Sequence, residues 1–151
     1  MAKRSAGILL YRITSFVEVL LVHPGGPFFI KKDAGAWSIP KGEIGEDEDP
    51  LLAAKREFKE ETGHAVKGKF IELATIKQAG GKMVHCWAVE GELDETTVKS
   101  NLFELEWPPK SGKKKEFPEV DKAAWFTIEE ARQKINPKQV AFIDELAEKL
   151  G

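Results

Sequence analysis

The sequence predicts one α/β domain whose β-sheet is covered on both faces, and three observations support this. The chain has 151 residues and 42% of them are hydrophobic, which supports a single globular domain with its own core. Segments 5–12 and 16–22 are rich in β-forming residues and almost continuously apolar, as expected of strands buried on both sides. Segment 51–62 has strong helix formers throughout.

Composition and charge exclude several classes of protein. The net charge of −2 gives no general attraction to nucleic acids or anionic membranes. The apolar runs 7–11 and 17–22 are short and strand-like, so we expect neither a signal peptide nor a membrane-spanning helix. The single cysteine, Cys86, agrees with a reducing cytoplasm and is interpreted as a buried small hydrophobe rather than a nucleophile. We therefore expect a cytoplasmic monomer or homodimer with no membrane or protein partner.

The two apolar segments 5–12 and 16–22 predict a strand pair joined by a short polar connection. The loop at 23–27, HPGGP, is incompatible with regular structure. Two adjacent cations follow it, Lys31 and Lys32. They are either solvated surface residues or contacts for phosphate oxygens. The second interpretation applies if they lie near an acidic loop that binds a metal ion.

A short strand at 37–42, WSIPKG, leads into the predicted helix. Pro40 and Gly42 predict a turn that brings backbone carbonyls towards the start of that helix. Trp37 has two interpretations, a platform on which a nucleobase stacks or a buried core tryptophan.

The helix has clear signals at both ends. Asp49 suits the N-cap, and Pro50 suits the first helical position because its missing N–H would be unpaired there in any case. Gly63 predicts the C-terminal stop.

Three carboxylates share one face of this helix. Glu57, Glu60 and Glu61 fall within an arc of about 100°. They are either a solvated acidic face or a set of hard oxygen ligands for a divalent cation such as Mg²⁺ or Mn²⁺. The second interpretation is favoured because the carboxylates repel one another and because the preceding loop is also acidic, with Glu43, Glu46, Asp47 and Glu48.

The middle of the chain predicts further strands. Segment 66–78 reads as one or two strands and segment 83–89 as a clearer one, with a turn at Gly80 and Gly81 between them. His85 interrupts segment 83–89. It is either a satisfied or half-exposed histidine or a substrate contact.

Segment 101–120 is the least regular, and a loop of this length in a compact domain is usually functional or mobile. It carries a basic cluster that belongs either to a solvated flexible loop or to a binding element for polyphosphate. The cluster consists of Lys110, Lys113, Lys114 and Lys115.

The C-terminal segment predicts one strand and two helices. Residues 122–126 form the strand, and residues 127–130 form a capping box that opens a short helix. Asn136 and Pro137 cap the last helix. An apolar stripe is expected to pack that helix on the core: Val140, Ile143, Ala147 and Leu150.

Residues 42–64 resemble the Nudix box, G-x5-E-x7-R-E-U-x-E-E-x-G-U, in which U is an aliphatic or aromatic residue. Eight specified positions match at fixed spacing: Gly42, Glu48, Arg56, Glu57, Phe58, Glu60, Glu61 and Gly63. The last U position departs, because His64 stands there. That departure concerns packing at the end of the helix and not the carboxylates.

The resemblance implies a Nudix-type three-layer α/β/α sandwich with a mixed β-sheet, formed by residues 1–151 as one hydrolase domain. It implies that Mg²⁺ or Mn²⁺ is held by Glu57, Glu60 and Glu61 together with the backbone carbonyl of Lys41. Similar proteins often take another metal ligand or base from just before the next strand, where Glu119 is the first candidate and Glu116 the second. The general base stays unassigned, since coupled carboxylates around a metal share their titration.

Two further residues of the box have an implied role in orienting the site. Glu48 and Arg56 are expected to form an ion pair that positions the glutamates. The catalytic set implied by the resemblance is therefore Glu48, Arg56, Glu57, Glu60, Glu61 and Glu119. The residues expected to contact substrate are Lys31, Lys32, Trp37, Lys41, His85, Lys113, Lys114 and Lys115.

The resemblance also implies a reaction, hydrolysis of a phosphoanhydride in a nucleoside diphosphate linked to another moiety. The form W-x-x-P-K-G at residues 37–42 looks like the subgroup that acts on dinucleoside polyphosphates. The favoured hypothesis is therefore asymmetric cleavage of a dinucleoside tetraphosphate. The same chemistry on nucleoside triphosphates, capped RNA ends, nucleotide sugars or diphosphoinositol compounds is the alternative. A third hypothesis is a non-catalytic nucleotide sensor, against which the complete set of carboxylates argues.

Overall fold

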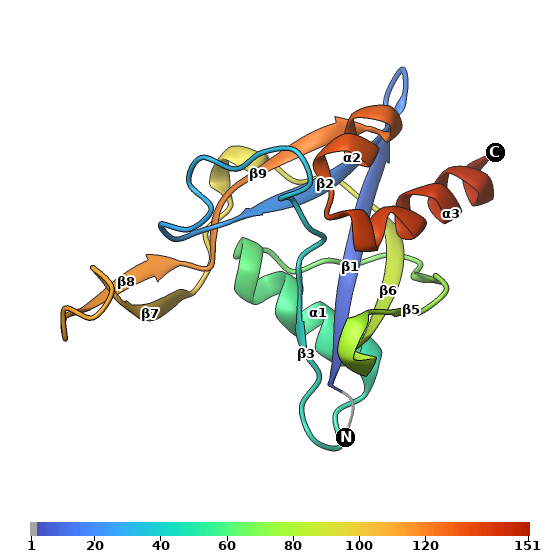
Figure 1. The fold of residues 1–151 in the computed structure, drawn as a ribbon. Helices are drawn as coiled ribbons and strands as arrows, with labels where there is room; N and C mark the ends of the chain where they lie inside the picture. The colour runs from blue at the N-terminus through green and yellow to red at the C-terminus, as the bar shows by residue number, and fades with distance from the viewer. Residues whose placement is uncertain (1–2) are drawn as a thin grey trace.

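A seven-stranded mixed sheet forms the centre of the computed structural model, which describes residues 3–151 (Figure 1). The strands are β1 (Arg4–Ile13), β2 (Val17–Pro24), β3 (Lys41–Glu43), β4 (Ile71–Glu72), β5 (Ile76–Lys77), β6 (Met83–Glu90), β7 (Leu102–Glu106), β8 (Lys114–Pro118) and β9 (Val120–Thr127). The α-helices are α1 (Pro50–Thr62), α2 (Ile128–Lys134) and α3 (Val140–Leu150). Short 3₁₀ turns are η1 (Ala79–Gly81), η2 (Glu95–Thr97) and η3 (Pro137–Gln139).

The main path of the sheet runs β4-β6-β1-β2-β9, with β3 paired to β1 and β5 paired to β6. β1 and β6 are parallel, and β1 and β2 form the predicted antiparallel pair. The prediction of a mixed sheet is therefore confirmed. Segment 66–78 supplies two very short strands, β4 and β5, on the side of β6 away from β1.

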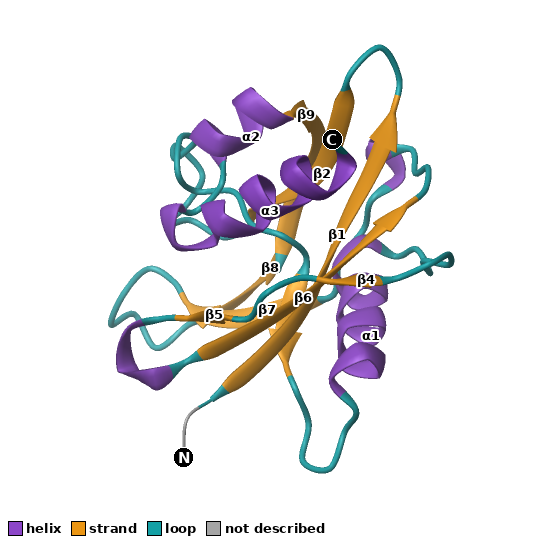
Figure 2. Ribbon diagram, turned by 90° about the vertical axis from the view of Figure 1, so that its right-hand side faces the viewer, coloured by secondary structure: helices purple, strands orange, loops and turns teal. Residues whose placement is uncertain are grey.

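Helices cover both faces of the sheet (Figure 2). Ile8 and Leu10 of β1 point into a core shared with α1, whereas Leu9 and Tyr11 point into a core shared with α2 and α3. The continuous apolar pattern of β1 follows directly, because both faces of this strand are buried. The predicted three-layer α/β/α arrangement is confirmed.

The helix α1 has the predicted ends. The Asp49 side chain accepts a hydrogen bond from the N–H of Leu52 at 3.1 Å, with Pro50 in the first turn. Gly63 ends the helix at φ 79°, a left-handed conformation that favours glycine. Phe58 is fully buried and fixes the helix on the sheet.

Segment 37–42 differs from its predicted form. Only β3 is a strand there, while Trp37 and Ser38 make isolated bridges to neighbouring segments. Gly42 does not lie in a turn but in β3, opposite Ala6 of β1. The turn prediction at Gly42 is therefore wrong. Glycine is needed for a close approach from another element instead.

Segment 101–120 is not an irregular loop. β7 and β8 form an antiparallel hairpin that projects from the body of the molecule (Figure 1). Its strands are held in register with Phe103 opposite Phe117, two aromatic rings 6.1 Å apart. The proline and lysine content of the tip obscured this pairing in the sequence.

The C-terminal elements agree with the prediction. Thr127 and Glu130 form the capping box of α2, and Asn136 caps the turn η3 that precedes α3. Of the predicted stripe of α3, Ile143 is buried and Val140 and Leu150 pack against the same core, which Phe142 and Leu146 also enter.

The structure also bears on the expected burial of Cys86 and on membrane-spanning helices. Cys86 is 1% exposed, as predicted, and burial raises the pKa of its thiol. Within residues 3–151, no helix combines the length and the apolar composition needed to cross a bilayer.

Candidate active site

The acidic face of α1 lies against β3. The Glu57 carboxylate reaches Gly42 so closely that a Cβ there would lie 2.1 Å from the Glu57 Cδ atom. Glu61 accepts a hydrogen bond at 3.2 Å from the backbone N–H of Lys41. The strand leading into the box and the helix within it are therefore joined through the two glutamates.

Arg56 connects the acidic loop with the acidic face of α1. Its Nε and Nη2 atoms donate to the two oxygens of Glu48 at 2.8 and 3.0 Å, a two-point contact. Its Nη1 atom donates to Glu57 at 2.8 Å and to Glu60 at 3.2 Å. Hydrogen bonds from Arg56 and from the N–H of Gly45 lower the pKa of Glu48 to about 2. Glu48 therefore stays ionised and holds the guanidinium in place.

Glu119 joins these carboxylates from another part of the chain. It lies between β8 and β9, and its backbone is fixed by hydrogen bonds to Asn101 at 2.9 Å and from Gly25 at 2.9 Å. Burial, followed by the charge of Glu60, raises the pKa of Glu119. Its carboxylate and that of Glu61 line the same cavity.

Four carboxylates lie close enough together for their negative charges to interact: Glu57, Glu60, Glu61 and Glu119. Burial, and then the charges of Glu57 and Glu119, raise the pKa of Glu61 to about 8, against the Lys41 N–H that lowers it. Burial also raises the pKa of Glu57, where the hydrogen bond from Arg56 acts in the opposite direction. Without a cation, such crowding is unfavourable.

The donor set suits a hard divalent cation, since it consists of carboxylate oxygens beside a backbone strand. Across residues 3–151, however, no three acidic, histidine or cysteine side chains already converge as a metal-binding group. Arg56 explains this, because its Nη1 atom lies between Glu57 and Glu60 and holds their oxygens. The chemistry of these residues fits a divalent cation such as Mg²⁺ or Mn²⁺.

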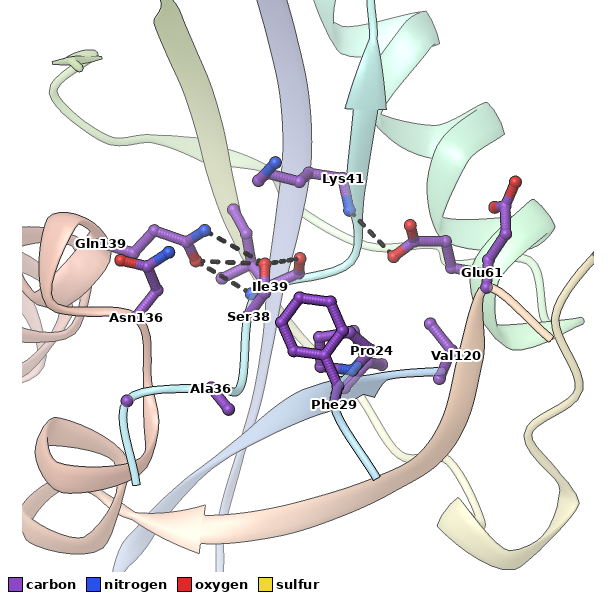
Figure 3. Close-up of a pocket in the computed structure, with 13 residues that line it drawn as sticks. Pro24, Phe29, Ala36, Ser38, Ile39, Lys41, Glu61, Val120, Asn136 and Gln139 are labelled. Atoms are coloured by element: carbon purple, nitrogen blue, oxygen red, sulfur yellow. Dashed lines mark hydrogen bonds between the residues drawn. The ribbon is translucent and has the colours of Figure 1, made fainter. Parts of the chain in front are cut away.

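A cavity of about 280 Å³ opens beside Glu61 and Glu119 (Figure 3). Phe29 and Pro24 line the cavity, and the segment Ser38–Ile39 forms another part of its wall. Its volume is at the lower end for pockets that enclose a small ligand. The cavity thus accepts one compact group next to the carboxylates.

The polar end of this cavity comes from the segment before α3. Gln139 is 1% exposed, and its amide oxygen accepts from the N–H of Ile39 at 3.1 Å while its amide nitrogen donates to Ser38 Oγ at 3.1 Å. Asn136 lines the cavity as well, and its side-chain oxygen accepts from the N–H of Lys138 at 3.0 Å. Within residues 3–151, the hydrogen bonds of the Asn136 side chain involve its amide oxygen and not its amide nitrogen.

Several residues expected to contact substrate lie elsewhere. Trp37 is 5% exposed and packs against Phe126 and His23, while its indole N–H donates to Asp33 at 2.8 Å. Its ring is therefore not open to a nucleobase, and the core interpretation is the correct one. The Lys41 side chain points away from Glu61, although its backbone faces that carboxylate (Figure 3).

His85 is half-buried on β6, two strands from Gly42 through Ala6. Its ring stacks on Trp87, and its Nδ1 atom lies 3.2 Å from the Thr75 hydroxyl. The residue is not among those lining the cavity beside Glu61. Ala6 of β1 therefore stands between His85 and Gly42 in the sheet.

The predicted lysines fall into different places. Lys31 and Lys32 are exposed at the end of the turn that carries Phe29, with the Lys32 ammonium 5.4 Å from the Phe29 ring. Lys113 and Lys115 lie on one face of the hairpin, whereas Lys114 lies on the other, opposite Glu106. The second metal candidate, Glu116, is also on that other face.

The sequence interpretation missed Phe29, Asn136 and Gln139 as lining residues. One signal for Gln139 was present, because it precedes Phe142 and Ile143 by three and four residues and so occupies an apolar-stripe position with a polar side chain. Phe29 gave no comparable signal. Its role depends on how its loop folds over β2.

Comparison with known proteins places this site in a family. The NUDIX domain family matches residues 1–146. An 8-oxo-(d)GTP phosphatase of Mycolicibacterium smegmatis is 31% identical in an alignment of 118 residues that covers 70% of this chain and 34% of that protein. The chain thus spans about a third of the length of this relative.

Solved structures share the fold. A C. elegans Ap4A hydrolase in a binary complex matches with a TM-score of 0.69 and 22% identity over 97% of each chain. The NUDIX domain of Shewanella oneidensis NrtR, complexed with ADP ribose, matches with a TM-score of 0.71 and 17% identity over 100% of this chain and 90% of that chain. With the family match over residues 1–146 and the box on α1, this chain belongs to the NUDIX family.

Proposed function

We propose that this protein is a Mg²⁺- or Mn²⁺-dependent hydrolase of a phosphoanhydride bond in nucleoside polyphosphates, with a dinucleoside tetraphosphate as the favoured substrate. One observation carries the proposal. Glu61 and Glu119 line the same cavity as Phe29 and Asn136. This supports a site in which carboxylates suited to a metal lie beside an aromatic ring suited to a nucleobase.

The residues have distinct tasks in this proposal. Glu57, Glu60, Glu61 and Glu119, with the Lys41 carbonyl, would hold the cation. When bound, it neutralises phosphate oxygens and lowers the pKa of water. One of the carboxylates accepts the proton of the attacking water.

The remaining residues orient the site and the substrate. Glu48 fixes Arg56, which in turn holds Glu57 and Glu60. Phe29 offers a ring face to a base, and Asn136 offers amide N–H groups to its edge. Lys31 and Lys32 lie on the same turn as Phe29, where they neutralise the phosphate chain.

The preference for a dinucleoside tetraphosphate rests on the W-x-x-P-K-G form at residues 37–42. A second candidate is an oxidised nucleoside triphosphate, favoured by the 31% identity to an 8-oxo-(d)GTP phosphatase. A non-catalytic sensor is less favoured, since a protein that only binds nucleotides does not need four crowded carboxylates.

We further propose that the domain works in a reducing cytoplasm as a monomer or homodimer. The buried thiol of Cys86 supports the first part, because a single cysteine provides no internal disulfide. Light scattering of the purified protein tests the second part.

Phosphate release over a substrate panel, with and without Mg²⁺, tests the activity. The panel contains a dinucleoside tetraphosphate, 8-oxo-dGTP, an unmodified triphosphate, a capped RNA end, a nucleotide sugar and a diphosphoinositol compound. Turnover of the dinucleotide that requires Mg²⁺ is expected. Turnover of 8-oxo-dGTP alone would establish the second candidate, and binding without any turnover would establish a sensor. Reaction in ¹⁸O-labelled water then identifies the phosphorus that is attacked.

A further inference from the structure

The β7–β8 hairpin begins and ends at the candidate active site. Before the hairpin, the N–H of Asn101 donates to the Glu60 carbonyl at 3.0 Å. After it, Glu119 supplies its carboxylate to the site. Ser100 and Val120 tie the two ends together, because the N–H of Val120 donates to Ser100 Oγ at 2.9 Å. The hairpin is therefore anchored to the end of α1 that carries the carboxylates.

The register of the hairpin separates its side chains into two faces of opposite character. Residues directly opposite each other share a face. One face, called here the inner face, carries Phe103, Leu105, Lys115 and Phe117, and it continues to Trp107, whose N–H donates to the Lys113 carbonyl at 2.9 Å. The opposite, outer face carries all three carboxylates of the two strands: Glu104, Glu106 and Glu116.

The inner face looks towards the turn that carries Phe29. A Cβ on Gly26 would lie 3.0 Å from the Phe103 ring, and the Phe28 ring meets the Trp107 ring edge-on at 5.6 Å. Phe28 nevertheless remains 57% exposed. Since Phe29, the next residue, lines the cavity, aromatic surface continues from the cavity to the hairpin.

The cations of the inner face make no ion pair with the part of the chain that the structure describes. Over residues 3–151, no carboxylate oxygen comes within 4.0 Å of the ammonium groups of Lys113 or Lys115, and the lysine ion pairs that exist are elsewhere. Glu104 and Glu116 stand opposite each other on the outer face, an arrangement of like charges that costs stability. This segregation leaves the inner face cationic and aromatic.

We infer that the inner face of the hairpin, together with Phe28, binds a second nucleotide at the far end of the phosphate chain. The inference rests on the proposed function, in which the first nucleoside occupies the cavity of about 280 Å³. Aromatic rings stack on any base, and unpaired lysines neutralise phosphate, so the surface has the chemistry of a non-specific nucleotide site. The second nucleotide is the other half of a dinucleoside polyphosphate, and binding of an RNA 5′ end is an outcome that the test distinguishes.

Steady-state kinetics of Trp107→Ala test the inference with three substrates: a dinucleoside tetraphosphate, a nucleoside triphosphate and a 5′-triphosphorylated RNA oligomer. Loss of one stacked base predicts a rise in KM of about tenfold for substrates that carry a second nucleotide. The KM for the triphosphate and all kcat values are expected to stay at their wild-type levels. Trp107→Phe retains a stacking ring and is expected to restore most of the affinity.

The lysines provide a matched comparison between the two faces. Lys113→Gln and Lys115→Gln are expected to raise the KM of the two-nucleotide substrate more than Lys114→Gln, which removes the same charge from the outer face. Equal effects of the three variants would refute the inner-face assignment. So would an equal rise in KM for mononucleotide and dinucleotide substrates in Trp107→Ala.

The two substrate arms identify the source of the second nucleotide. Dependence on Trp107 with the dinucleotide assigns the site to dinucleoside polyphosphates, and dependence only with the oligomer assigns it to RNA. If the wild-type protein hydrolyses none of these substrates, the proposed function fails. Binding measured by calorimetry still tests the inference in that case. Tighter binding of the dinucleotide than of the triphosphate, with the difference lost in Trp107→Ala, supports the inference. Equal binding of the two ligands by the wild-type protein overturns it.

Discussion

The carboxylate of Glu57 lies directly against the backbone of Gly42, where a Cβ would come within 2.1 Å of both the Cδ and the Oε2 atoms. This contact explains the first glycine of the box. Gly42 lies in β3, so its role is not to make a turn but to leave room for a side chain of α1. β3 and α1 can pack this closely only because residue 42 lacks a side-chain methyl group.

Gly42→Ala is expected to abolish most activity and leave the fold intact. The new Cβ collides with the end of a flexible side chain, so the Glu57 carboxylate turns away and the backbone stays in place. Turnover and thermal midpoint, measured together, check this. Gly91→Ala is the control, because its Cβ would meet only Leu10, at 3.1 Å. Equal turnover in both variants would show that the position of the Glu57 carboxylate does not matter for activity.

Glu60→Gln and Glu61→Gln are each expected to lower turnover by orders of magnitude without unfolding the protein. Each replaces an oxygen ligand by a neutral amide and leaves the core untouched. Initial rates across a Mg²⁺ titration provide the measurement, with Glu46→Gln in the exposed acidic loop as the control. A wild-type rate in either purified variant would refute the assignment to the metal.

Arg56→Lys is expected to lower turnover about tenfold or more, although the charge is kept. Lysine lacks the planar group that contacts Glu48 at two points while it holds Glu57 and Glu60. We expect the loss in kcat rather than in KM, since Arg56 positions the carboxylates. Arg132→Lys is the matched control, because Arg132 makes an ion pair with Asp144 away from the site. Comparable losses in the two variants would contradict this role.

The metal-free protein is expected to lose stability as the pH rises from about 4.5 to about 8. The folded state holds the Glu61 proton up to a pKa of about 8, whereas an unfolded chain releases it near the ordinary value of 4.5. The folded state therefore binds more protons across this window, and its stability falls as those protons are lost. Glu48, whose pKa is lowered to about 2, loses its contribution only below this window.

Thermal midpoints in a chelator between pH 5 and pH 8 measure this effect. Glu61→Gln is expected to flatten the profile, because the amide does not titrate. Added Mg²⁺ is expected to raise the midpoint most at the upper end of the range, where binding does not require proton release. A wild-type profile that is flat, or that rises with pH, would show that Glu61 is not held protonated.

Local signals in the sequence determined α1 and what it carries. Asp49, Pro50 and Gly63 set its ends, and helical spacing alone placed Glu57, Glu60 and Glu61 on one face. The continuous apolar pattern of β1 indicated a sheet with both faces covered. These features depend on residues close together in the chain, so they can be recognised from the sequence without the fold.

Tertiary structure decided which distant residues reach that helix, although the family resemblance already pointed to Glu119. It brought Glu119 to the carboxylates, buried Trp37 and placed His85 two strands away. It also converted an apparent loop into a hairpin with Lys113 and Lys114 on opposite faces. Burial and charge proximity arise from contacts between segments far apart in the chain, and the sequence contains no periodicity that records them.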